Sequence, residues 1–161
     1  MASNPVRTGN RPSGPLADEG TMETEDLLIS IKPEYFQAIL EGRKRYELRK
    51  VAITTSRIDR VFIYVTRPVG RIVGSFRIGS VIEGRPLLLW RKVGGESGVD
   101  SEAFFRYFKG HERGFAIGIT DLFIFKSPID PWCRIRDFRP PQSHVYLGPA
   151  MSRDLGLDSA R

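Results

Sequence analysis

The chain contains very little cysteine and histidine. Among its 161 residues there is one cysteine, Cys133, and there are two histidines, His111 and His144. A single cysteine excludes an internal disulfide, and so few cysteines and histidines make a structural zinc site an unlikely interpretation. A domain of this size can bury a sufficient core without such links. We therefore expect neither a metal site nor a cofactor.

Long apolar runs are also missing. No stretch is long enough to span a membrane, and the first residues lack the apolar segment of a secretory signal. We therefore expect a cytoplasmic protein without a membrane partner.

Acidic residues are fewer than basic ones. The chain has 19 aspartates and glutamates against 25 lysines and arginines, which gives a formal net charge of +6 and a pI of about 9.8. A positive balance favours polyanionic partners such as nucleic acid, because cationic side chains neutralise phosphates and release counterions. Many basic proteins bind no nucleic acid, so the charge alone supports this partner only weakly.

Large apolar residues are scarce at both ends of the chain. Residues 1–25 contain several prolines and glycines and too few apolar side chains to offset the entropy of ordering, which predicts a disordered N-terminal tail. The composition after Leu147 is similar, so residues 148–161 are predicted to be a C-terminal tail. One folded domain is expected between them, at residues 26–147.

Short apolar and alternating segments predict mostly strands within this domain, with a few short helices between them. Proline at position 33 and glycine at position 42 fit the start and the end of a first helix. Ile72, Gly74, Phe76 and Ile78 alternate and are expected to share one face of their strand. The predicted fold class is α+β, a small mixed β-barrel with short flanking helices. Its expected strands are 27–31, 44–50, 61–65, 71–81 and a final one at 115–125; its expected helices are 33–42, 87–92 and 101–110.

Five basic residues and one acid crowd the segment 43–50, directly after the first predicted helix. Lys44 suits a phosphate or a base carbonyl, and Arg49 can fork onto a phosphate or pair with an acid. Glu47 can accept a hydrogen bond from an exocyclic amine, or act as a general acid or base if it is desolvated. The alternative is a solvated strand with surface ion pairs, each worth about 0–1 kcal/mol.

Strand alternation limits how these three side chains can meet. Glu47 and Arg49 fall on one face of a regular strand and Lys44 on the other. The three converge only if Lys44 still belongs to the turn before the strand.

The spacing Gly42-x-Lys44-x-x-Glu47-x-Arg49 resembles the G-x-K-x-x-E-x-R signature of the ASCH family. The similarity is collinear over about residues 27–147. The further segments that resemble the family are Ser30-Ile31-Lys32-Pro33, Ile63-Tyr64, Val73-Gly74-Ser75-Phe76, Tyr107-Phe108-Lys109-Gly110, Phe115-Ala116-Ile117 and Pro140-Pro141-Gln142-Ser143.

This resemblance implies a PUA-like fold with a cleft beside the signature that binds RNA. Some ASCH relatives are enzymes, including an amidohydrolase acting on an acetylated cytidine and proteins with ribonuclease activity. In the amidohydrolases a threonine nucleophile stands three positions after the signature lysine, where this chain has Glu47. The resemblance therefore does not extend to that hydrolase activity, and we assign no catalytic residue. A metal-independent ribonuclease would draw its acid, base and cation from Lys44, Glu47 and Tyr64.

Aromatic and polar residues near the signature complete the expected binding set. Tyr35 and Tyr64 are predicted to stack on bases, and Lys32 and Thr66 to contact phosphate or base edges. Residues outside this set are interpreted differently: Trp90 and the phenylalanines at 104, 105 and 108 as core, His111 and His144 as loop residues, Cys133 as unreactive, and Gln142 and Ser143 as a segment that can close the cleft.

Three functions follow from these residues. The first is a nucleic-acid-binding module that holds single-stranded RNA or a modified nucleotide in a basic cleft through Lys32, Tyr35, Lys44, Glu47, Arg49, Tyr64 and Thr66. The second is a ribonuclease or modified-nucleoside hydrolase that uses the same cleft. The third is a regulatory sensor of a small nucleotide-like ligand.

Overall fold

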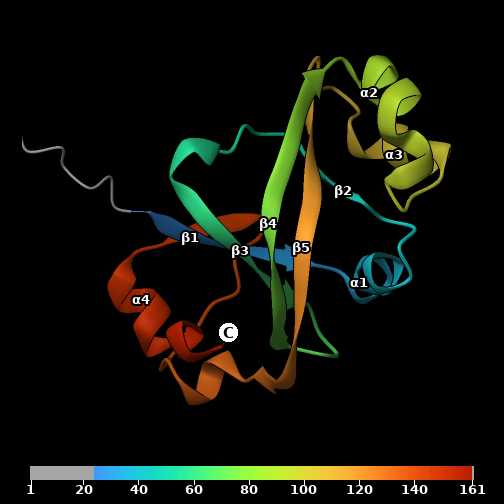
Figure 1. Cartoon of the computed structure of the whole chain (residues 1–161). Coiled ribbons are helices and arrows are strands. Elements are labelled where there is room, and N and C mark those ends of the chain that lie inside the picture. The colour runs from blue at the N-terminus through green and yellow to red at the C-terminus, as the bar shows by residue number, and fades with distance from the viewer. Residues whose placement is uncertain (1–23, 161) are drawn as a thin grey trace, which may run out of the picture.

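The computed structural model describes residues 24–160, which form six strands, four α-helices and several short 3-10 turns (Figure 1). Residues 1–23 of the predicted N-terminal tail lie outside the described residues. No helix in the described part is long and apolar enough to cross a membrane. The strands are β1 (Glu25–Ile31), β2 (Tyr46–Arg49), β3 (Ile58–Val65), β4 (Arg71–Gly84), β5 (Gly114–Ile129) and β6 (His144–Leu147); the helices are α1 (Pro33–Leu40), α2 (Pro86–Val93), α3 (Ser101–Tyr107) and α4 (Pro149–Asp154).

The strands form one mixed sheet in the order β2-β5-β4-β3-β1-β6. The β1–β3 pair is parallel, and the other neighbours are antiparallel. The two longest strands, β4 and β5, run side by side through the molecule, and the sheet curls around them into a half-barrel (Figure 1). The predicted α+β class is confirmed, with β2 and β6 as the two edges of the half-barrel.

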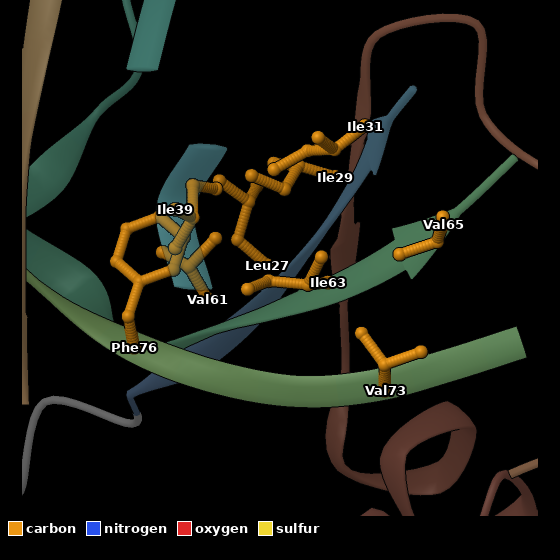
Figure 2. Close-up of a cluster of buried hydrophobic side chains, with 9 residues drawn as sticks. All are labelled: Leu27, Ile29, Ile31, Ile39, Val61, Ile63, Val65, Val73 and Phe76. Carbon is orange, nitrogen blue, oxygen red and sulfur yellow. The ribbon is translucent and has the colours of Figure 1, made fainter. Parts of the chain in front are cut away.

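The main core fills the concave side of this sheet. Alternate residues of β1 and β3 point to the same side as Val73 and Phe76 of β4, and Ile39 of α1 covers them (Figure 2). Strand alternation therefore places the intervening residues, such as Phe62 and Tyr64, in a second cluster on the opposite face.

A bulge in β4 corrects the predicted alternation of that strand. Between Ile63 and Tyr64 of β3 the facing residues of β4 advance by two, from Gly74 to Ile72, which leaves Val73 as the extra residue. Ile72 therefore belongs to the second cluster, whereas Phe76 lies in the main core. The prediction that Ile72 and Phe76 share a face is wrong because a bulge reverses the alternation, and the bulge bends the strand as a half-barrel requires.

The segment after Leu147 differs from its predicted form as a tail. Pro149 opens α4, and Leu155 and Leu157 are fully buried against the second cluster, beside Leu28 and Phe62. The strand predicted at 115–125 is present as β5, but it is not the last one, because β6 follows it and pairs with β1. A few leucines suffice to anchor the segment, since each contributes about 1.5–3 kcal/mol when fully buried.

The helices α2 and α3 are inserted between β4 and β5 and lie together at one end of this strand pair (Figure 1). Asp100 caps α3 by accepting a hydrogen bond from the Ala103 amide at 2.8 Å. Phe104 and Phe108 pack with Leu48 of β2 in a third cluster. This packing fixes the position of β2, whose other face carries Glu47 and Arg49.

Candidate functional site

A cleft of about 500 Å³ opens between the signature segment, α1, α3 and the loop before β6. Most of the sequence-predicted binding residues meet here, although they come from distant parts of the chain. The residues lining the cleft are Ser30, Lys32, Tyr35, Lys44, Glu47, Leu48, Arg49, Lys50, Val51, Thr66, Val99, Ala103, Phe104, Tyr107, Gln142 and Ser143.

Lys44 lies just before β2, where it forms an isolated bridge with Ser97. Its side chain is 4% exposed, and its ammonium donates to the carbonyl oxygens of Tyr46 and Ser97 at 3.0 and 2.9 Å. Gly98 packs directly on the lysine stem: a Cβ at position 98 would lie 2.7 Å from the Lys44 Cβ, and the backbone φ there is +72°. A glycine is therefore required beside the lysine, for both space and conformation.

Glu47 joins the two signature cations. Its carboxylate lies 3.2 Å from the Lys44 ammonium and 3.0 Å from the Arg49 guanidinium. The three residues, which we call the buried triad, are each at most 9% exposed. They converge because Lys44 lies in the turn before β2, so the alternation of the strand does not apply to it. This is the condition under which the sequence allowed the three side chains to meet. The alternative of a solvated strand with surface ion pairs is wrong for these three residues.

Arg49 spans the gap between the two edges of the half-barrel. One of its terminal nitrogens donates to the backbone carbonyl and the hydroxyl of Ser143, at 3.2 and 2.9 Å, just before β6. Its Nε and Nη2 are buried without a hydrogen-bond partner in the described residues. The contact from Nη2 to Glu47 is an ion pair that lacks hydrogen-bond alignment. Within the described part of the chain, Arg49 therefore has two nitrogens without a hydrogen-bond partner, whereas the Lys44 ammonium already donates to two backbone carbonyls.

The wall facing the triad is apolar and aromatic. Tyr107 of α3 contributes its ring, and its hydroxyl donates to the Leu48 carbonyl at 3.2 Å. The Lys50 ammonium lies 4.6 Å from the centre of that ring. Burial raises the pKa of Tyr107, so the phenol stays protonated at neutral pH. Sequence reasoning missed Tyr107, although it stands in a segment resembling the family and shares a helix face with Ala103.

Three other predicted residues also line the cleft. Lys32 and Tyr35 lie at the start of α1, and Thr66 follows β3. The Tyr35 ring centre is 5.5 Å from the Lys44 ammonium, so an aromatic ring stands beside the triad. Gln142 and Ser143 reach the cleft from the loop before β6, as predicted for a closing segment.

Tyr64 is the exception, and its predicted place in the cleft is wrong. It is 1% exposed and lies in the second cluster, with its ring centre 6.0 Å from those of Trp132 and Phe138. Its neighbours Ile63 and Val65 occupy the main core, so alternation turns Tyr64 to the opposite face of the sheet. Of the three groups suggested for a ribonuclease, Lys44, Glu47 and Tyr64, the last is therefore not in the cleft.

Comparison with known proteins agrees with this architecture. A family model for the ASCH domain matches residues 29–115. The chain belongs to the ASCH domain family. A relative named ASCH domain-containing ribonuclease, from Zymomonas mobilis, is 30% identical over 127 residues, which are 78% of this chain and 86% of the relative.

Solved structures extend the comparison from sequence to fold. The crystal structure of ASCH from Zymomonas mobilis has a TM-score of 0.68 at 28% identity, covering 82% of this ASCH domain chain and 94% of that one. The N-terminal domain of Staphylothermus marinus McrB has a TM-score of 0.55 at 11% identity, with 84% and 94% covered, and is similar in fold alone. The PUA-like α+β fold expected from the sequence is confirmed.

His144 begins β6 beside the cleft of this ASCH domain. Its Nδ1 lies 3.3 Å from the Ser143 hydroxyl. Burial, and then the charge of Arg49, lower the pKa of His144. The imidazole is therefore neutral at pH 7, with a lone pair available on one nitrogen.

The lowered pKa of His144 makes stability depend on pH. Because the unfolded chain binds a proton more readily than the folded one, the free energy of unfolding should fall as the pH drops below the unfolded pKa of about 6.5. The His144→Gln variant should show a smaller loss between about pH 6.5 and 5. Urea unfolding at several pH values measures this, with His111→Gln as the control. Identical slopes for wild type and His144→Gln would contradict the assignment.

The described residues contain no group of three or more histidine, cysteine, aspartate or glutamate side chains that could hold a metal ion. Cys133 is exposed and free, away from the cleft lining. The side chains that line the cleft and can act chemically include the buried triad, Ser143 and Tyr107.

Proposed function

We propose that this ASCH domain binds single-stranded RNA and holds one nucleotide in the cleft. The observation that carries the proposal is the contrast between the two cleft walls. The buried triad and Ser143 line one wall with charged and polar groups, while Tyr107 and Val99 line the other with apolar surface. A nucleotide has matching parts, a flat base that stacks on aromatic rings and an anionic, hydrogen-bonding remainder.

Each residue takes a role that its contacts allow. Arg49 lines the cleft and donates from its guanidinium to a phosphate or a base oxygen. Tyr35 and Tyr107 flank the base, and exposed Lys32 contacts the backbone phosphates. Lys44 was expected to bind the ligand directly, but its ammonium is buried against two backbone carbonyls and the Glu47 carboxylate, so we infer that it holds Glu47 in place.

Binding can be measured by fluorescence anisotropy with a labelled single-stranded RNA of about eight nucleotides. We expect saturable binding that weakens steeply as salt rises, because bound phosphates release counterions. Single-stranded DNA and duplex RNA of the same sequence serve as controls. Absence of binding at low salt would contradict the proposal. Binding of a mononucleotide but not of RNA would favour a small-ligand sensor instead.

RNA cleavage in the same cleft is a second candidate, favoured by the 30% identical relative that is named a ribonuclease. In a metal-independent reaction, the ribose 2′-hydroxyl gives its proton to a base and its oxygen attacks phosphorus, while the bond to the 5′-oxygen breaks and that oxygen takes up a proton from a general acid. Glu47 and His144 are the groups here that can accept the proton, and Arg49 can stabilise the charged phosphorane. End-labelled RNA incubated with the protein and a chelator tests this. Uncut RNA under conditions of full binding would exclude it.

A further inference from the structure

A second depression lies at the turn between β3 and β4, with a volume of about 750 Å³. Its lining includes Arg67 from the strand connection, Arg71 from the start of β4 and Trp132 from the short turn after β5. Thr66, the residue before Arg67, lines the cleft. The linings of the cleft and of the depression are therefore adjacent in the chain at Thr66 and Arg67, and no sequence motif points to the depression.

The guanidinium of Arg67 is held over the ring of Trp132, 5.4 Å from its centre. Trp132 is itself fixed, because its ring meets those of Tyr64 and Phe138 edge-on and its amide donates to the Asp130 carboxylate at 3.0 Å. The indole therefore positions a planar cation on the protein surface at little entropic cost. We call this pair the Arg67 patch.

In the part of the chain that the structure describes, Arg67 has no acidic partner, whereas its neighbour Arg71 does. The Asp130 carboxylate pairs with Arg71 at 3.0 Å, and Arg71 also donates to the Gly70 carbonyl. Among the described residues Arg67 joins no ion pair, and its side chain is exposed. Its outer face is thus free for a second planar group, and its N–H groups are free for an anion.

We propose that the Arg67 patch is a second RNA subsite, which binds the nucleotide next to the one in the cleft. The base stacks on the guanidinium of Arg67, which itself lies on the indole of Trp132. The adjoining phosphate accepts a hydrogen bond from Arg67 or Arg71. The inference rests on the proposed RNA binding. It adds a path for the bound RNA, which runs from the cleft past Thr66 to Trp132.

The test uses Trp132 as a reporter. The chain has two tryptophans, and Trp90 is packed among phenylalanines in the third cluster, so the Trp90→Phe variant leaves Trp132 as the sole tryptophan. In this background a short single-stranded RNA should change the tryptophan fluorescence in a saturable way, whereas a mononucleotide should not. An equal response to both would overturn the subsite.

Substitution of Arg67 supplies the matching affinity measurement. Arg67→Ala should weaken binding of the short RNA about fivefold or more and leave mononucleotide binding unchanged. Arg67→Lys, which keeps the charge but loses the plane, should recover only part of the affinity. Arg91→Ala, at an exposed position on α2, is the control for general charge loss. Equal effects of Arg67→Ala and Arg91→Ala would overturn the subsite while leaving RNA binding in the cleft intact. A wild-type protein that binds no RNA would overturn both proposals.

Discussion

Replacing Glu47 with glutamine should lower the free energy of unfolding by about 3–5 kcal/mol. The substitution keeps the shape of the side chain but removes the negative charge between Lys44 and Arg49, which lie 3.2 and 3.0 Å from the carboxylate. Two cations are then buried together with no compensating charge, and breaking a buried pair in this way is far more costly than losing an exposed one. Urea unfolding followed by circular dichroism measures the change.

A matched control is available in another ion pair of the basic segment 43–50. Glu96 pairs with Arg45 at 3.4 Å, but both side chains are largely exposed, so Glu96→Gln should change stability by less than about 1 kcal/mol. Inorganic phosphate should restore part of the stability lost in Glu47→Gln, because the anion can replace the missing charge. Equal, small effects of the two substitutions would show that the triad is solvated. They would contradict its description as a buried, charge-paired part of the cleft wall.

Replacing Arg49 with alanine should weaken binding of single-stranded RNA by about 10- to 100-fold, which corresponds to the loss of one or two charge-assisted hydrogen bonds. Arg49 is the triad member with buried donors that lack partners, and it also holds Ser143 at the cleft edge. Arg49→Lys should recover little of the affinity, since an ammonium cannot reproduce the planar fork. Anisotropy titrations at constant salt compare the variants.

The control for this substitution is Arg43→Ala. Arg43 belongs to the same basic segment, but it is exposed and pairs with Glu41 outside the cleft. Its loss should change the affinity about twofold or less, through general charge alone. Circular dichroism and thermal unfolding must show that Arg49→Ala remains folded. A folded Arg49→Ala protein that binds RNA as tightly as Arg43→Ala would exclude Arg49 as a ligand contact.

The sequence predicts the family, the fold class and most of the cleft because these depend on local signals. The spacing of Lys44, Glu47 and Arg49 identifies the signature. Pro33 and Gly42 mark the start and the end of the first helix, and the turn that follows it frees Lys44 from strand alternation. Contacts between residues that are far apart in the sequence cannot be predicted from such local signals. The Arg49–Ser143 contact joins residues 94 positions apart, and only the closure of the half-barrel brings them together.

Two errors have their source in reading periodicity without tertiary structure. Tyr64 stands in a segment that resembles the family, but its place in β3 turns it away from the cleft and into the second cluster. The bulge at Val73 reverses the alternation of β4, and no single residue in that strand signals it. A third error comes from composition: the segment after Leu147 resembles a tail, yet Leu155 and Leu157 are buried against a hydrophobic face that the sheet supplies.

The most direct test of the account is an NMR titration of the isotope-labelled protein with a short single-stranded RNA at low salt. We predict saturable shifts grouped around the cleft, at the backbone amides of Tyr35, Arg49, Tyr107 and Ser143, with resonances of α4 unchanged. Shifts that are absent, or that gather on α4 and the second cluster while the cleft amides stay still, would contradict the claim that this cleft holds RNA.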